Sequence, residues 1–87
     1  MFILEYSAKA ITDLKKLPKT VQLRILDKMD TYAAQSDPGI FAKELSGRSE
    51  SRFRVGDYRA IVDLDKKTET ILVLRVGKRD TIYGIKI

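Results

Sequence analysis

The chain has 87 residues, no cysteine, no histidine and a formal net charge of +5. This length allows one small domain, and the missing side chains exclude disulfides, thiolate chemistry and the usual transition-metal ligands. The hydrophobic fraction of 44% and the charged fraction of 33% are those of a folded domain, and the basic charge favours an anionic partner. No apolar run approaches a membrane span, and the N-terminus lacks the features of a signal peptide. We therefore expect a single cytoplasmic domain, residues 1–87, with no membrane, metal or cofactor.

A strand and a helix are predicted at the N-terminus. Residues 2–6 are mostly apolar, with β-branched and aromatic members, which favours a strand, and Ser7 is a suitable N-cap for a following helix. Apolar residues then recur at helical spacing over residues 8–17, while polar and charged side chains fill most of the other positions. The apolar positions of this amphipathic helix are Ala8, Ile11, Leu14 and Leu17.

A second helix is predicted after Pro18. Proline is tolerated in the first turn of a helix, and the apolar period continues to about Ala34. The positions that carry this period are Val21, Ile25, Met29 and Tyr32. The short connection between the two helices predicts an antiparallel helical hairpin. A strong turn signal at residues 36–39 ends it, and residues 40–47 are expected to lead to the next strand.

From Ser51 onward the apolar period changes to two, which is typical of β-strands. Gly56 and Asp57 form a two-residue turn signal between two alternating strands. Pairing outward from this turn predicts three opposed pairs, which are Val55 with Tyr58, Arg54 with Arg59, and Arg52 with Ile61. Like charges directly opposite each other on a sheet are unfavourable, so the arginine pair implies an anionic occupant.

The two faces of this β-hairpin differ in chemistry. Arg52, Arg54 and Arg59 point to one side, while the other side collects apolar residues for the core. The predicted core residues are Phe53, Val55, Tyr58, Ala60 and Val62. The arginine fork of donors suits bidentate contact with phosphate, and six of the seven arginines lie between Arg48 and Arg79. A phosphate chain or an acidic partner is therefore the expected ligand of the arginine side.

Two further strands are predicted over residues 58–64 and 70–76, with a polar turn between them. If Leu64 pairs with Thr70 across a five-residue loop, Arg75 lies opposite Arg59. Three residues of the last strand would then join the core, namely Leu72, Leu74 and Val76. A two-residue turn would instead bury Arg75, which is costly without a partner, so we favour the first register.

The predicted order β-α-α-β-β-β indicates an α+β fold in which the two N-terminal helices cover one face of a small four-stranded sheet. The other face is left to four arginines, which we name the cationic face: Arg52, Arg54, Arg59 and Arg75. Gly77 then leads into a C-terminal segment that carries Lys78, Arg79 and Tyr83.

Several segments together resemble the RelE/ParE superfamily of toxin proteins, most closely its RelE branch. They are DLKKLP at residues 13–18, KELSG at 43–47, FRVGDYR at 53–59 and LRVGKR at 74–79, followed by Tyr83. The resemblance spans nearly the whole chain and implies a mainly antiparallel sheet backed by the two helices. It also implies a toxin of a type II toxin-antitoxin system, an endoribonuclease that cleaves messenger RNA in the decoding site of the ribosome. In such proteins a ribose 2′-hydroxyl attacks the adjacent phosphate, and a partner antitoxin blocks the activity.

The resemblance assigns roles to particular residues. It implies a catalytic set of Arg54, Arg59, Arg79 and Tyr83, with the tyrosine stacking on or positioning the nucleotide. Substrate binding falls to Arg52 and Lys78, and the predicted register adds Arg75. The expected partners are a cognate antitoxin and the ribosome with messenger RNA, and DNA is reached only through the antitoxin.

The proton-transfer groups depart from the family pattern. Arg52 and Arg54 stand where well-understood relatives carry lysines, and an arginine side chain is a poor general base. Lys78 and Tyr83 remain as candidates, so we expect catalysis to be mainly electrostatic and positional. Tyr83 has an equally simple alternative, in which it packs the C-terminal extension onto the sheet.

Three alternatives stay open on the sequence alone. The arginines could form a solvated face with surface ion pairs, which is the commoner role of any single arginine. The chain could be a ParE-branch toxin, which shares the fold and poisons DNA gyrase, or an inactive toxin relative that serves as a binding module.

Overall fold

The computed structural model describes residues 1–41, 43–44 and 50–82. Its elements, in chain order, are β1 (Ile3–Tyr6), α1 (Ala8–Lys15), α2 (Lys19–Ala33), the 3-10 helix η1 (Pro38–Phe41), β2 (Lys43–Glu44), β3 (Glu50–Val55), β4 (Tyr58–Asp65), β5 (Thr70–Lys78) and α3 (Arg79–Ile82). The strands form one sheet in the order β1-β5-β4-β3-β2. β1 runs parallel to β5, and every other neighbouring pair is antiparallel.

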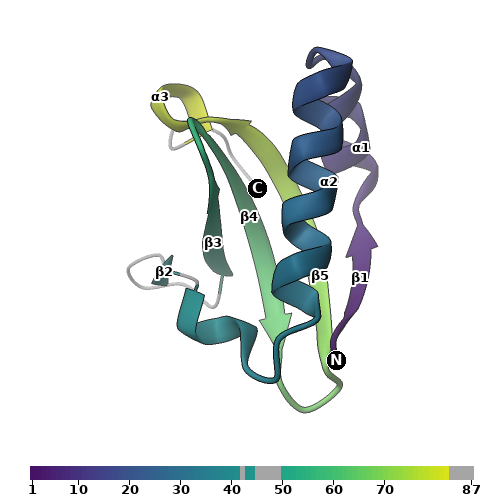
Figure 1. Cartoon of the computed structure of the whole chain (residues 1–87), viewed down its shortest axis with the longest axis vertical. Helices are drawn as coiled ribbons and strands as arrows, with labels where there is room; N and C mark the ends of the chain where they lie inside the picture. The colour runs from purple at the N-terminus through teal and green to yellow at the C-terminus, as the bar shows by residue number, and fades with distance from the viewer. Residues whose placement is uncertain (42, 45–49, 83–87) are drawn as a thin grey trace.

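The predicted α+β fold is confirmed. α1 and α2 lie side by side against the sheet, and α3 lies at the far end of β5, away from both helices (Figure 1). The sequence predicted the four longer strands, and the structure adds the two-residue β2 at the edge beside β3. No helix in the described ranges is long and apolar enough to cross a membrane.

The start of α1 is fixed by Ser7, as expected for an N-cap. Its hydroxyl accepts a hydrogen bond from the backbone N–H of Ala10 at 3.0 Å and donates to the carbonyl of Leu74 at 2.9 Å. The helix therefore begins where β1 ends and stays attached to β5. Its buried residues are Ala10 and Leu14, whereas the predicted apolar positions Ala8 and Ile11 are exposed, so only part of the predicted face was right.

The core lies between the two helices and one face of the sheet. Its largest buried side chains include Ile25 and Met29 of α2, Phe53 of β3, and Ile71 and Val73 of β5. The ring of Tyr32 stacks on the ring of Phe53 with 4.3 Å between centroids, and its hydroxyl donates to the carbonyl of Arg54 at 2.8 Å. α2 is thereby held against the β3–β4 hairpin by this hydrogen bond as well as by apolar packing.

The register between β4 and β5 differs from the predicted one. Leu64 pairs with Ile71, and Arg59 lies opposite Gly77, while Arg75 lies opposite Ile61. An irregularity between Ile61 and Val62 gives β5 one extra residue, which is a β-bulge.

The bulge explains why the predicted core positions Leu72 and Leu74 were wrong. The branched side chains of Ile71 and Val73 fill the core instead, and strict alternation from Val73 would next bury Arg75. Because the extra residue Leu74 shifts the alternation of side chains along β5 by one position, Val76 faces the core and Arg75 faces the opposite side of the sheet.

The face opposite the helices is partly covered. Ile61 is 3% exposed and Ile82 is fully buried, yet neither belongs to the core on the helix side. α3 packs against β4 and β5, so the end of the described chain covers part of the face that the sequence left to the four arginines.

Candidate functional site at the end of the β3–β4 hairpin

The turn between β3 and β4 has the predicted register. Val55 pairs with Tyr58 and Arg54 with Arg59. Gly56 has a φ of 58°, which fits a type II′ turn with glycine at its first central position. The two arginines therefore lie directly opposite each other beside the turn.

The side chain of Arg59 is fixed by the turn itself. Its Nη1 atom donates to the carbonyl of Gly56 at 2.8 Å and to the carbonyl of Tyr58 at 2.9 Å. Arg54 has an exposed side chain, and its carbonyl accepts the hydroxyl of Tyr32. The side chain of Arg59 is thus held against the backbone of the turn, while the side chain of Arg54 opposite it is exposed to solvent.

Arg79 is brought to the same turn by its backbone. Its N–H donates to the carbonyl of Asp57 at 2.9 Å, and its side chain is exposed as the first residue of α3. Lys78 is exposed just before it and lies opposite Tyr58. We name Arg54, Arg59 and Arg79 the hairpin arginine cluster.

The hairpin arginine cluster has no acidic partner in the described part of the chain. No described carboxylate lies within 4.0 Å of the three guanidinium groups, although Asp57 and Asp80 are close in sequence. Such a group of cations, with part of its donors already held by backbone, is suited to binding an anion that carries several oxygens.

Arg75 has a different environment from the one predicted. Its Nε and Nη2 atoms donate to the two carboxylate oxygens of Asp13 at 2.8 and 3.0 Å, and the N–H of Val76 donates to the same carboxylate at 3.0 Å. The predicted position opposite Arg59 was wrong, because the bulge moves Arg75 to Ile61. No local pattern in the sequence indicates this pair, since its two residues are 62 positions apart.

The ion pair changes the acidity of both groups. Burial raises the pKa of Asp13, but the hydrogen bonds from Arg75 and Val76 and the charge of Arg75 lower it by more, so the net pKa falls below its ordinary value of 3.8. The same hydrogen bond raises the pKa of Arg75. Side-chain exposures of 20% for Arg75 and 10% for Asp13 mark this as a structural pair that joins α1 to β5.

Two further predicted site residues are Arg52 and Tyr83. Arg52 is half-buried in β3, opposite Ile61 on one side and Lys43 of β2 on the other. Tyr83 lies outside the described residues. Within those residues no group of three or more acidic, histidine or cysteine side chains could hold a metal ion.

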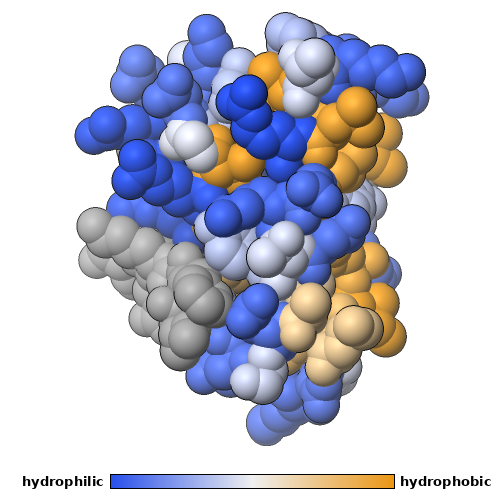
Figure 2. Space-filling view, in the orientation of Figure 1, coloured by the Kyte–Doolittle hydropathy of each residue, from blue (hydrophilic) through white to orange (hydrophobic). Residues whose placement is uncertain are grey.

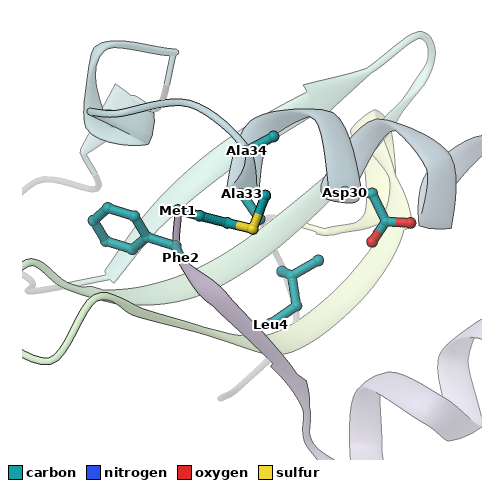
Figure 3. A pocket seen from close by; sticks show the side chains of 6 residues that line it. All are labelled: Met1, Phe2, Leu4, Asp30, Ala33 and Ala34. Atoms are coloured by element: carbon teal, nitrogen blue, oxygen red, sulfur yellow. The ribbon is translucent and has the colours of Figure 1, made fainter.

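A separate hollow lies at the start of the chain, between β1 and the end of α2 (Figure 3). It is lined by Met1, Phe2, Leu4, Asp30, Ala33 and Ala34. Among its described lining residues Asp30 has the one charged side chain, so the hollow lacks the arginine side chains that gather at the hairpin end. In the space-filling view, hydrophilic residues dominate the upper left of the molecule, over the hairpin end, whereas the larger hydrophobic patches lie mainly along the right side (Figure 2).

The fold is that of RelE toxins. The chain superposes on the toxin-antitoxin complex RelBE2 from Mycobacterium tuberculosis with a TM-score of 0.80 and 24% identity, covering 90% of this chain and 98% of that one. An archaeal RelE-RelB complex from Pyrococcus horikoshii OT3 gives a TM-score of 0.73 with 26% identity, covering 90% and 94%. The isolated RelE toxin of E. coli gives 0.73 with 19% identity, covering 97% and 93%.

The sequence itself matches a family model over most of its length. The family is described as the ParE toxin of type II toxin-antitoxin system, parDE, and the match covers residues 4–83. The chain therefore belongs to the ParE toxin family, within the RelE/ParE superfamily of type II toxins. A search of curated proteins gave no match.

Proposed function

We propose that this toxin is an endoribonuclease that cleaves messenger RNA on the ribosome and so inhibits translation. The observation that carries the proposal is the hairpin arginine cluster, in which Arg54 opposes Arg59 and the backbone of Arg79 is tied to the same turn. A phosphate in a messenger RNA chain is the ligand that such a cluster fits best.

The chemistry follows from what the cluster can stabilise. Attack of a ribose 2′-oxygen on the neighbouring phosphorus breaks the bond to the 5′-oxygen and leaves a 2′,3′-cyclic phosphate and a 5′-hydroxyl. Negative charge accumulates on the phosphoryl oxygens during this step, and fixed cations stabilise it. In this proposal Arg59 and Arg79 clamp the scissile phosphate, and Arg54 orients it.

Further residues complete the proposed site. Arg52 and Lys78 contact the adjacent sugar-phosphate chain, and Tyr83 stacks on a base or positions it. A proton leaves the 2′-hydroxyl and another reaches the 5′-oxygen, with Lys78, Tyr83 or groups of the ribosome as carriers. Because the arginine cations are permanent, phosphate binding and charge stabilisation should change little between about pH 6 and pH 8, so a strong pH dependence of the cleavage rate in that range would come from the proton carriers.

The partners follow from the family. The similar structures from Mycobacterium tuberculosis and Pyrococcus horikoshii OT3 are toxin-antitoxin complexes, which supports a cognate antitoxin for this chain. We place the toxin in the cytoplasm, where ribosome and messenger RNA are available, and DNA contact is left to the antitoxin.

The direct test is cleavage of a defined messenger RNA on programmed ribosomes. Wild-type toxin should cut the message in the decoding site and leave a 5′-hydroxyl on the downstream fragment, while RNA free of ribosomes stays intact. Intact message on programmed ribosomes at saturating toxin would refute the proposal.

A second function has one specific observation in its favour. The matching family model is that of the ParE toxin of a type II toxin-antitoxin system. The resemblance to the ParE branch implies action on DNA gyrase. A supercoiling assay with purified DNA gyrase separates the two functions: inhibition together with intact message supports a gyrase poison, and cleavage with normal supercoiling supports the nuclease.

A further inference from the structure

A second cationic surface lies on the other side of the hairpin turn. A groove between α2 and the hairpin is lined by Arg24, Asp27, Lys28, Thr31, Val55 and Gly56. It contains two cations and one carboxylate, and it meets the candidate site at Gly56, whose carbonyl accepts the side chain of Arg59. One backbone residue thus borders both surfaces.

The cations of the groove are not neutralised by the acid between them. Among the described residues, no carboxylate lies within 4.0 Å of the charged groups of Arg24 or Lys28, although Asp27 shares their groove. The Nζ atom of Lys28 lies 5.3 Å from the centroid of the Tyr32 ring. That contact orients the lysine and leaves its N–H donors available to another ligand.

The backbone at Gly56 is accessible in this groove, and hydrogen bonding and packing hold the strand before it in place. A Cβ atom built on Gly56 would have no neighbouring heavy atom within 4 Å, so a ligand can approach the backbone there. Val55 beside it is buried, and the Tyr32 hydroxyl anchors the preceding carbonyl of Arg54. The positive charge of Arg54 also acts on Tyr32, where burial raises the pKa of the phenol and this charge opposes the rise.

We propose that the groove of Arg24 and Lys28 binds phosphates of the single-stranded RNA that flank the cleaved bond. The strand passes from the hairpin arginine cluster around Gly56 onto α2. The inference deepens the proposed function and rests on it, because it assumes that the occupant of the hairpin end is RNA. A single strand suits this path better than a duplex, since its backbone can bend around a two-residue turn.

The experiment measures binding separately from cleavage. The probe is a fluorescein-labelled RNA of about ten nucleotides with 2′-O-methyl riboses, which lack the attacking hydroxyl and therefore cannot be cut by that route. Fluorescence anisotropy gives Kd over a series of salt concentrations, with the purified full-length toxin and no ribosome.

The test variant is Arg24→Gln/Lys28→Gln. It should weaken binding and reduce the slope of log Kd against log salt by about 1.4, because each single-strand phosphate contact contributes about 0.7. The matched control is Lys15→Gln/Lys67→Gln, which removes the same charge from the end of α1 and the loop after β4, where no described carboxylate lies within 4.0 Å of either ammonium group. The control should keep most of the wild-type slope, and the charge-preserving Arg24→Lys/Lys28→Arg should restore it.

Each contrary outcome is informative. Two results would refute RNA binding by the groove: equal slope changes in the test and control variants, or no binding of this RNA by the wild type at low salt. A decamer of glutamate that loses affinity in the test variant while the RNA does not would make the groove a site for acidic peptides instead. If Arg54→Gln/Arg59→Gln weakens RNA binding and the groove variant does not, RNA binding by the groove is refuted while the proposed site at the hairpin arginine cluster is supported.

Discussion

Two sets of arginines in this small domain differ in their acidic partners. Arg75 forms a bidentate ion pair with Asp13 and is largely shielded from solvent. The hairpin arginine cluster has no described carboxylate within 4.0 Å and is partly oriented by backbone carbonyls. The same residue type therefore joins a helix to the sheet in one place and remains open to an anion in another. Substitutions at the two sets of arginines and their partners should therefore have different effects on activity and on stability.

The largest effect is expected from Arg79→Ala. Loss of one fixed cation at the scissile phosphate should reduce cleavage on programmed ribosomes by about 100-fold to 1000-fold. The free energy of unfolding should hardly change, because the backbone N–H that binds Asp57 is retained. Lys67→Ala, at the exposed loop after β4, serves as the control for lost charge. Full activity of Arg79→Ala would remove this arginine from the site.

A loss of stability with a structural cause is expected from Asp13→Ala. The change leaves Arg75 and the N–H of Val76 without their acceptor, which should lower the free energy of unfolding by about 2–3 kcal/mol. For a domain of this size that corresponds to a fall in Tm of roughly 10 °C or more. Asp63→Ala, which removes an exposed carboxylate from β4, should change Tm little. A similar Tm for the two variants would contradict the structural role of the pair.

A smaller effect is expected from Tyr32→Phe. It removes the hydrogen bond to the carbonyl of Arg54 while keeping the stack on Phe53, which should cost about 1 kcal/mol in chemical denaturation. Because this bond anchors the strand that carries Arg54, the affinity for the RNA probe should also fall slightly. An unchanged unfolding midpoint would show that the hydroxyl makes no net contribution.

The pH dependence of the ion pair should be the smallest of these effects. The pKa of Asp13 is lower in the folded chain than in the unfolded chain, so its stabilisation is complete above about pH 4 and is lost as the pH falls further. Asp13→Asn keeps an acceptor for Val76 but removes the charge. The difference in unfolding free energy between wild type and Asp13→Asn should therefore shrink from about pH 6 to pH 3, and a constant difference would speak against the charged pair.

The first hairpin could be predicted from the sequence because its information is local. Gly56 and Asp57 fix the turn, and the period of two then determines which residues oppose each other. The two helices and the fold class were predictable for the same reason, since their apolar periods are continuous. The opposition of Arg54 and Arg59 followed without any knowledge of the remaining chain.

The rest could not be predicted because its causes are distant in the chain. At the bulge, Val73 and Val76 are both buried while Arg75 between them is not. An alternating pattern with a period of two does not predict this spacing. The pairing of Arg75 with Asp13 requires α1 to lie beside β5, and that placement depends on the whole fold. The groove on α2 was missed for a similar reason, since it exists only where helix and hairpin meet.

The bulge also has a consequence for how copies of this protein meet in solution. An open strand edge offers unpaired N–H and C=O groups to the strands of other chains. β1 pairs with β5 as far as Val73, and beyond this point the Ser7 hydroxyl takes the carbonyl of Leu74 while Asp13 takes the N–H of Val76. The side chains of Ser7 and Asp13 thus occupy backbone groups of β5 from Leu74 to Val76, so this stretch of the strand is not open to pairing with the strands of other chains.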